Sequence, residues 1–271
     1  MTTSLIALGS GSRGNCFVLE CEGAVLLIDA GFSAKEITKR AERAGIDLAG
    51  LVGVALTHEH GDHASGALRL AARHGAPVLT SPGTWRSLTK SGNEGAAHRP
   101  IGSALRVEVG PFTVWGCPIA HDATEPLAVA VEALDGVKIG IAYDLGRPTA
   151  AVRLLLRELT AVILEANHDE ILLRTSGYPP SVQQRIAGSA GHLSNRAAAD
   201  LLLESMHPGL GTVLLAHLSQ RCNNEELART TVETALKRKG FKGVVSVARQ
   251  DDPVGPLRLT RCDGAQMAFA I

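Results

Sequence analysis

The sequence predicts a layered α/β fold. Short runs rich in Val, Ile and Leu alternate with helix-like segments along most of the chain, a pattern typical of sheets that carry helices on their outer faces. The chain has 271 residues, 45% of them hydrophobic, so it can bury a large core. Because no repeat, low-complexity block or Pro- or Ser-rich linker interrupts it, we expect one domain spanning residues 1–271.

The apolar periodicity indicates individual elements in order along the chain. Aliphatic, β-branched runs bounded by turn residues predict strands, and apolar residues recurring every three or four positions predict helices. In the first half, we expect strands at 15–21 and 24–29, a helix at 33–45, a strand at 51–57, a helix at 63–74 and a strand at 77–80. The polar, Gly- and Ala-rich segment 91–101 predicts a surface loop.

The second half continues the alternation. The predicted strands lie at 112–119, 127–133, 137–143, 160–165 and 211–216, and the predicted helices at 149–158, 194–206 and 223–239. Strand-like pieces at 242–248, 256–260 and 267–271 end the chain.

The bulk composition argues against several classes of protein. The 27 basic and 27 acidic side chains cancel, which disfavours a histone-like or arm-type nucleic-acid binder but allows a local basic rim. Aromatic residues make up only 3%, so base-stacking platforms are expected to be few. No apolar stretch reaches membrane-spanning length, and the N-terminus lacks a secretory pattern. The five scattered cysteines favour reduced thiols and a cytoplasmic location.

The segment Thr57-His58-Glu59-His60-Gly61-Asp62-His63 is the most informative stretch. Imidazole and carboxylate groups are the ligands that hold zinc, manganese or iron. His58 and His60, two residues apart on an extended segment, project to the same side and can bind one ion. Asp62 and His63 stand where a helix is expected to start, so a second ion is expected beside the first. The alternative, a turn rich in histidine, is disfavoured because a turn gains nothing from three imidazoles.

Three further candidate ligands, His121, Asp144 and His217, stand just past apolar runs, where a strand delivers a side chain to the edge of its sheet. Taken singly, the two histidines could be hydrogen-bonded core residues and the aspartate a helix N-cap. Together with the segment 57–63, they complete two three-ligand sites and one shared carboxylate. Catalytic metals keep a position open for water, and two neighbouring ions can share a hydroxide.

Other segments add polar groups whose roles are open. The Gly/Ser loop at 8–16, between the first two strands, could be a flexible hairpin, or its N–H groups and Arg13 could bind an anionic oxygen. Glu165 and His168 end another strand, and His192 precedes a predicted helix. Five arginines in or beside these segments could contact phosphates, although scattered arginines are more often solvated surface: Arg13, Arg147, Arg174, Arg185 and Arg221.

The pattern as a whole resembles that of the metallo-β-lactamase superfamily. His-x-His-x-Asp-His, followed by a lone His, a lone Asp and another lone His at strand ends, covers residues 1 to about 220. The resemblance implies a four-layer αββα sandwich with the metals at one edge. Asp29 matches the superfamily's first motif, which supports the site without binding metal. The implied ligands are His58, His60 and His121 for the first ion, Asp62, His63 and His217 for the second, and Asp144 as the bridge.

Three segments narrow the resemblance to nucleic-acid phosphodiesterases, notably ribonuclease Z: Glu165-Ala166-Asn167-His168-Asp169, Gly191-His192-Leu193-Ser194-Asn195 and His217-Leu218-Ser219. The first histidine of the ribonuclease Z motif His-Glu-Ala-Thr, its proton donor, aligns with Leu164 here. His168 is therefore the first candidate for the donor and His192 the second. Glu165 is expected to hold an imidazole in its productive tautomer.

A closer resemblance is to the YycJ/WalJ-like branch of the superfamily. It includes the Ser-Gly-Ser-x-Gly-Asn-Cys start, Leu-Ile-Asp-Ala-Gly at 27–31 and Pro-Val-Leu-Thr-Ser-Pro-Gly-Thr-Trp at 77–85, and it runs nearly end to end. The branch is regarded as an exonuclease-like phosphodiesterase that acts on double-stranded DNA from 5′ ends. The resemblance therefore implies an enzyme with nucleic acid as its substrate, DNA being favoured over RNA.

The implied mechanism uses two divalent ions, zinc or manganese, with iron also compatible. They would lower the pKa of a bridging water, and the resulting hydroxide would attack phosphorus while Asp62 orients its proton. One alternative is a small-molecule hydrolase that opens a thioester, lactone or β-lactam, which the segments at 165–169 and 191–195 disfavour. A non-catalytic nucleic-acid-binding scaffold is disfavoured by the complete ligand set. A redox di-iron role is disfavoured because His60 stands where that branch usually has glutamate.

Overall fold

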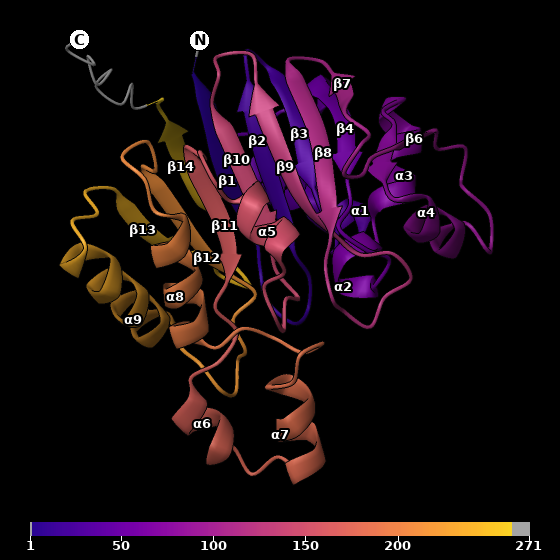
Figure 1. Cartoon of the computed structure of the whole chain (residues 1–271). Coiled ribbons are helices and arrows are strands. Elements are labelled where there is room, and N and C mark those ends of the chain that lie inside the picture. The colour runs from indigo at the N-terminus through magenta and orange to yellow at the C-terminus, as the bar shows by residue number, and fades with distance from the viewer. Residues whose placement is uncertain (1, 262–271) are drawn as a thin grey trace, which may run out of the picture.

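Two seven-stranded sheets pack face to face between two layers of helices in the computed structural model of the chain, which describes residues 2–261 (Figure 1). The layered α/β expectation and the αββα sandwich implied by the resemblance are both confirmed. Beyond the lower edge of the sheets in Figure 1, two short helices project away from the sandwich: α6 (Glu170–Arg174) and α7 (Pro180–Ile186).

The first sheet contains the N-terminal strands and the last described strand. In spatial order these strands are β14 (Val254–Leu259), β1 (Thr3–Gly9), β2 (Cys16–Cys21), β3 (Ala24–Ile28), β4 (Leu51–Ala55), β5 (Val78–Thr80) and β6 (His98–Pro100). Neighbours from β14 to β3 are antiparallel, and those from β3 to β6 are parallel. The helical segments of this half are α1 (Ala34–Arg43), the 3₁₀ turn η1 (Leu48–Gly50), α2 (Gly61–Ala64), α3 (Ala67–His74) and α4 (Pro82–Leu88).

The second sheet is built in the same way from the rest of the chain. Its strands are, in spatial order, β13 (Val244–Val247), β12 (Thr212–Ala216), β11 (Ala161–Glu165), β10 (Lys138–Ala142), β9 (Leu127–Ala133), β8 (Phe112–Pro118) and β7 (Val107–Val109). Strands β13 to β10 are parallel, and β9, β8 and β7 continue antiparallel. The helices that cover this sheet are α5 (Ala150–Leu155), α8 (Asn195–Ser205) and α9 (Glu225–Arg238).

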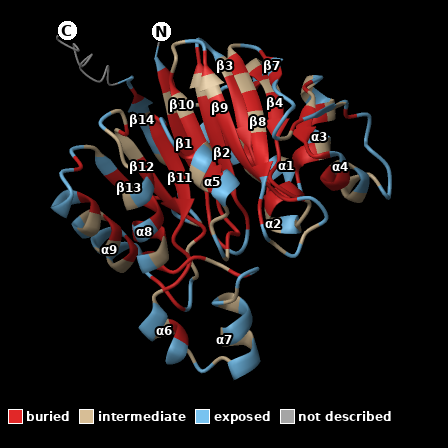
Figure 2. Cartoon of the chain, in the orientation of Figure 1, coloured by how far each residue is buried: buried red, intermediate tan, exposed pale blue. Residues whose placement is uncertain are grey.

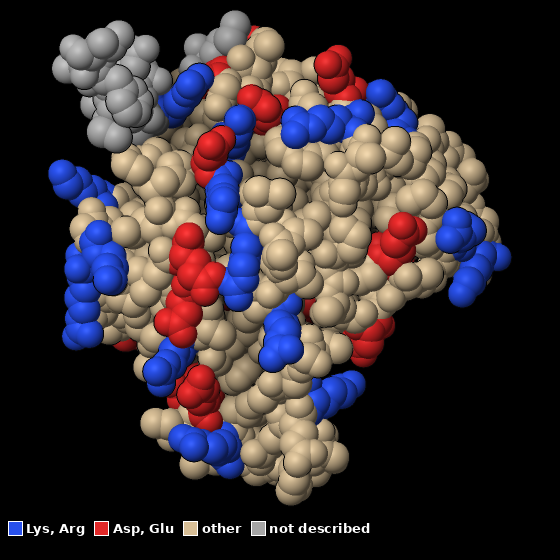
Figure 3. Space-filling model, in the orientation of Figure 1, with Lys and Arg blue, Asp and Glu red and all other residues tan. Residues whose placement is uncertain are grey.

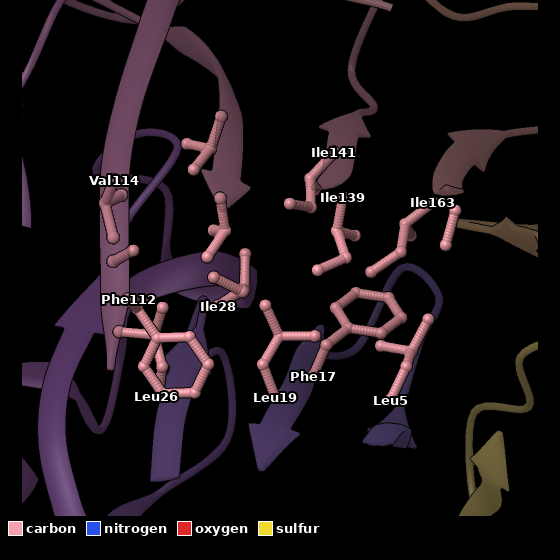
Figure 4. Close-up of a cluster of buried hydrophobic side chains, with 14 of the residues drawn as sticks. Leu5, Phe17, Leu19, Leu26, Ile28, Phe112, Val114, Ile139, Ile141 and Ile163 are labelled. Carbon is pink, nitrogen blue, oxygen red and sulfur yellow. The ribbon is translucent and has the colours of Figure 1, made fainter. Parts of the chain in front are cut away.

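Aliphatic side chains from the facing surfaces of both sheets form the central core. Figure 4 shows Leu19 and Phe17 of the first sheet opposite Ile139 and Ile163 of the second. Two outer clusters fill the spaces beneath α1 and α3 and beneath α5, α8 and α9. Both faces of each sheet are therefore covered, which explains why most strands are nearly continuous apolar runs and are buried along their length (Figure 2).

Several local features differ from the sequence-based expectations. The helix predicted at 63–74 is two helices, α2 and α3, because the N–H of Gly66 donates to Ala30 O at 2.8 Å and bends the chain there. The loop predicted at 91–101 contains β6, which pairs with β5. No predicted range covers β1, η1, α4, β7, α6 or α7, and the strand expected at 267–271 lies outside the described residues.

Two expectations about the chain's chemistry can be compared with the described residues. Their four cysteines are free and buried, in keeping with the expected reduced thiols. Within residues 2–261, no helix is both long and apolar enough to cross a membrane.

Candidate metal centre

Strands of both sheets deliver polar side chains to one edge of the sandwich. In the first sheet, β3 leads to Asp29 and β4 leads to the segment 57–63. In the second sheet, β8, β10 and β12 lead to His121, Asp144 and His217. The structure brings all seven predicted ligands together, in overlapping groups whose candidate ligand atoms lie within 4.8 Å of one another.

Three histidines surround the first candidate position. His60 Nδ1 lies 3.1 Å from His58 Nε2 and 3.3 Å from His121 Nε2. Burial lowers the pKa of His58 and of His121, which favours their neutral forms. A neutral imidazole is the form that binds a metal, so the environment suits ligation.

Asp62, His63 and His217 surround the second candidate position. Asp62 Oδ2 lies 3.3 Å from His63 Nε2 and 3.6 Å from His217 Nε2. Asp144 lies between the two positions, with its Oδ2 2.9 Å from His63 Nε2 and 3.8 Å from His58 Nε2. One carboxylate is therefore placed where it can contact ions at both positions.

Unpartnered buried atoms show that this arrangement fits cations. Among the described residues, no well-oriented hydrogen-bond partner reaches Asp144 Oδ2 or His217 Nε2, although Asp144 Oδ2 lies beside an imidazole. Buried polar atoms are nearly always hydrogen-bonded, so orphaned atoms converging on one place suit an ion. The fold and the His/Asp clusters are compatible with a di-metal site, and the mixed nitrogen and oxygen donors suit zinc, manganese and iron alike.

Asp29 lies beneath the ligands and accepts four hydrogen bonds. Its carboxylate accepts from Thr57 N and Thr57 Oγ1, both at 2.8 Å, and from Tyr143 OH and His63 Nδ1, both at 2.6 Å. The bond to Nδ1 leaves the Nε2 atom of His63 directed at Asp144 and the second candidate position. Asp29 therefore orients a candidate ligand, the role implied by the resemblance.

The Gly/Ser loop after β1 supports the site from another side. Ser10 Oγ accepts a hydrogen bond from His217 N at 2.8 Å, and Asn15 N donates to Asp62 O at 2.8 Å. Asn15 Oδ1 in turn accepts from Ser10 Oγ at 2.7 Å. The sequence left two roles open for this loop, a flexible hairpin or a site for an anionic oxygen. These contacts indicate a different role, which is to position the candidate ligands.

Three residues of the site have positive φ angles without being glycine: Asp29 at 54°, Asp144 at 54° and His217 at 56°. This conformation costs roughly 1–2 kcal/mol per residue for an L-amino acid. Each of the three stands directly or nearly directly after a strand, where the sharp bend turns its side chain into the site. Such strain typically clusters at functional sites.

Glu165, the last residue of β11, contacts two histidines. Its Oε1 lies 2.7 Å from His192 Nδ1 and 3.1 Å from His217 Nδ1. Burial alone would lower the pKa of His192, but the Glu165 and Asp144 carboxylates raise this pKa to about 10. Burial alone would raise the pKa of Glu165, but His192 lowers that pKa to about 2. Both shifts favour an imidazolium paired with a carboxylate.

The two candidate proton donors occupy different places. His168 is only 2% exposed and does not line the cavity above the candidate ligands. His192 lines this cavity, which has a volume of about 330 Å³. The geometry therefore favours His192, the second candidate, for contact with a substrate.

The sequence analysis did not single out two tyrosines of the site. Tyr143 is 1% exposed and donates to Asp29, and Tyr178 lines the cavity. They are the only two tyrosines of the chain. A buried phenol needs a hydrogen-bond partner. The position of Tyr143, directly before the candidate ligand Asp144, could therefore have indicated that its hydroxyl contacts the site. Tyr178 stands in a segment without a strong pattern, so the sequence offers no comparable signal for it.

The five arginines noted in the sequence also lie in different settings. Arg13 forms an exposed ion pair with Asp251 at 2.8 Å, Arg221 Nε donates to Ser176 O at 2.9 Å, and Arg185 lines the cavity. On the face shown in Figure 3, basic and acidic side chains are interspersed. That face therefore carries no field of a single sign.

Comparisons with known proteins agree with this site. The family profile of the Metallo-beta-lactamase superfamily matches residues 9–144. The chain is 31% identical to exodeoxyribonuclease YycJ of Bacillus anthracis over 255 residues, 93% of this chain and 96% of that protein. It is 30% identical to exodeoxyribonuclease WalJ of Streptococcus pneumoniae serotype 2 over 233 residues, 84% and 86% of the two chains.

Solved structures share the fold at lower sequence identity. YhfI of Bacillus subtilis, a metallo-beta-lactamase fold protein, aligns with a TM-score of 0.71 at 17% identity, over 94% of this chain and 99% of that one. The short form of human tRNase Z aligns with a TM-score of 0.63 at 18% identity, over 93% and 99%. These similarities establish the architecture of the two sheets and their helices.

Proposed function

The chain belongs to the metallo-beta-lactamase superfamily, and from this premise we propose that it is a divalent-metal-dependent phosphodiesterase that degrades DNA as an exonuclease. Two relatives named exodeoxyribonucleases, 30–31% identical over 84–93% of the chain, support a DNA substrate. The observation that carries the proposal is the Glu165–His192 pair: an imidazole that contacts a buried carboxylate lines the cavity beside the candidate metal positions, where it would serve as the proton donor.

Seven residues would hold the metals. We assign His58, His60 and His121 to one ion, Asp62, His63 and His217 to the other, and Asp144 to both. Two bound divalent ions would supply an activated water as nucleophile and would neutralise charge on the phosphate oxygens.

The remaining residues of the site move or direct protons. We assign to His192, oriented by Glu165 through Nδ1, the protonation of the departing sugar oxygen from its Nε2 atom. Asp62 is 30% exposed on the cavity side, where a free carboxylate oxygen can orient the attacking water. His168, buried away from the cavity, is assigned no contact with the substrate.

The finer proposal is digestion of double-stranded DNA from 5′ ends, which rests on the resemblance to the YycJ/WalJ-like branch. Purified protein with manganese or zinc would be incubated with duplex DNA, single-stranded DNA and RNA, each labelled at one defined end. We expect the duplex to be degraded fastest, with mononucleotides released first from its 5′ end. Release from the 3′ end, or faster cleavage of RNA, would overturn this finer proposal. The coarser proposal, that the protein is a phosphodiesterase, would still hold.

Asp62→Ala tests the metal-dependent chemistry itself. Loss of a metal ligand should abolish hydrolysis, whereas the far-UV circular dichroism should stay nearly unchanged because Asp62 is partly exposed. Asp200→Ala, on the exposed side of α8, is the matched control and should retain activity. Turnover by Asp62→Ala, or wild-type cleavage of thioesters in preference to phosphodiesters, would refute the proposed function.

A further inference from the structure

The segment that carries α6 and α7 extends away from the two sheets at the edge where the candidate ligands lie (Figure 1). It buries little of its own surface: α7 has no buried residue, and α6 has only Leu173 (Figure 2). Its position therefore does not come from core packing. Specific contacts to the loops of the metal centre hold it instead.

The connection between α6 and α7 is tied to the loop after β12. Arg221, four residues beyond His217, donates from Nε to Ser176 O at 2.9 Å. The guanidinium carbon of Arg221 lies 4.4 Å from the centre of the Tyr178 ring. A cation over an aromatic ring is attractive, so Arg221 holds the ring in place.

The C-terminal end of α7 is tied to the loop that carries His192. The N–H of His192 donates to Ile186 O, at the last residue of α7, at 2.8 Å. Gly191 packs so closely on this turn that a Cβ there would lie 2.2 Å from Arg185 O. The backbone of Arg185 is thus fixed relative to the candidate proton donor.

Each of these two attached regions contributes a residue to the lining of the cavity above the candidate ligands. Among the described residues that line it, Tyr178 is the only aromatic one apart from histidines, and Arg185 is the only lysine or arginine. Arg221, which lies over the Tyr178 ring, does not itself line the cavity. Among residues 2–261, the Arg185 guanidinium has no ion pair and no hydrogen bond.

We propose that Tyr178 and Arg185 form a nucleotide-binding subsite, in which the Tyr178 ring stacks on a base and Arg185 binds a phosphate of the strand being cleaved. This inference rests on the proposed function, since it names the part of a DNA substrate that the cavity receives. Stacking tolerates every base, and a guanidinium on a phosphate carries no sequence information. The subsite therefore suits an enzyme that removes nucleotides one after another regardless of sequence.

Abasic substrates test the stacking contact directly. Two otherwise identical duplexes would carry either normal nucleotides or tetrahydrofuran abasic residues at the terminal positions. We expect the wild type to lose roughly tenfold in kcat/KM on the abasic duplex, and Tyr178→Leu to lose this discrimination between the two substrates. Tyr178→Phe, which keeps the ring, should restore it. The ratio is independent of how much protein is folded, so a less stable variant remains informative.

Salt dependence tests the phosphate contact. Arg185→Gln should raise KM several-fold with little change in kcat. It should also reduce the magnitude of the slope of log(kcat/KM) against log salt by about 1, the change expected when one phosphate contact is lost. Arg157→Gln, an exposed arginine that does not line the cavity, is the matched control and should leave both quantities unchanged.

The outcomes separate this subsite from the proposed function. Wild-type cleavage of methyl p-nitrophenyl phosphate, which has no base, reports phosphodiesterase chemistry alone. If the wild type cleaves DNA but treats both duplexes equally, or if Tyr178→Leu still discriminates, the proposed subsite is wrong. The proposed phosphodiesterase function would not be affected by either result. If the wild type cleaves no phosphodiester at all, both fail.

Discussion

Asp29 governs a candidate ligand without being one. Its carboxylate is fully buried and accepts from Thr57, His63 and Tyr143, so its charge is spread over four hydrogen bonds. The bond to His63 Nδ1 fixes the tautomer in which Nε2 is free to bind a metal. The ionised carboxylate also makes His63 a stronger base, which favours ligation.

Asp29→Asn should therefore weaken metal binding while keeping the size of the side chain. We expect the dissociation constant for zinc, measured by competition with a chelating dye, to rise roughly 10- to 100-fold. Asp135→Asn is the matched control, because Asp135 also accepts from the N–H and hydroxyl of a threonine, Thr3, but belongs to the hairpin that joins β9 to β10. Equal affinities for both variants would show that Asp29 does not orient His63.

The Glu165–His192 pair predicts a pH dependence of stability in the metal-free protein. The folded-state pKa of His192, about 10, is raised above its ordinary value of 6.5. Its contribution is therefore fully present below about pH 6.5 and is lost as the pH rises through 10. The folded-state pKa of Glu165, about 2, is lowered from 4.5, so its contribution requires a pH above about 4.5.

His192→Asn should thus cost about 2 kcal/mol of unfolding free energy at pH 6, and much less at pH 10. Urea unfolding in the presence of EDTA at the two pH values measures the difference. The control is His74→Asn, because burial lowers the pKa of His74 and should make its effect small and opposite in sign. A cost for His192→Asn that does not decline with pH would contradict a charged pair.

Among the elements, the strands that deliver the site were predictable because their runs of Val, Ile and Leu end abruptly in a polar residue. The run before Asp144 and the run before His217 each coincide with a strand to within about two residues. The break between α2 and α3 was not predictable, because it depends on a hydrogen bond from Gly66 to a residue far away in sequence. The helix α7 was missed because it buries no apolar face, and periodicity reports only burial.

The loop after β3 makes a close contact that sequence patterns cannot reveal. Gly31 packs against the first turn of α2, where a Cβ would lie 1.7 Å from Asp62 O. Gly31 N also donates to Asn15 O at 2.9 Å, which joins this loop to the Gly/Ser loop. Any side chain at position 31 must displace the backbone that carries two candidate ligands.

Gly31→Ala should therefore destabilise the protein by about 2–4 kcal/mol and remove most of the metal-dependent activity of the fraction that folds. Thermal unfolding and zinc titration of the variant measure both effects. Gly102→Ala is the matched control, because a Cβ at Gly102 meets no atom within 4 Å. Equal behaviour of the two variants would show that the contact with α2 is not needed for the site.

On the scale of the whole molecule, the metal centre joins the two sheets. Four candidate ligands follow β4 of the first sheet, and three follow β8, β10 and β12 of the second. Between the sheets lies a core made mainly of aliphatic side chains (Figure 4). Ions bound at this edge would therefore link the two halves of the sandwich and favour the folded state over the unfolded chain.

Removal of metal should accordingly lower the stability of the entire fold. A ligand present at 100 times its dissociation constant stabilises a protein by about 2.7 kcal/mol, and for a chain of this size about 1 kcal/mol corresponds to 2–4 °C in Tm. We expect the Tm of the zinc-loaded protein to fall by roughly 5–10 °C in EDTA and to return when zinc is restored. Asp144→Asn, which weakens contacts to both positions, should reduce this shift, whereas Asp200→Ala should show it in full. A Tm that does not respond to EDTA in the wild type would mean that these seven side chains do not hold ions across the two sheets.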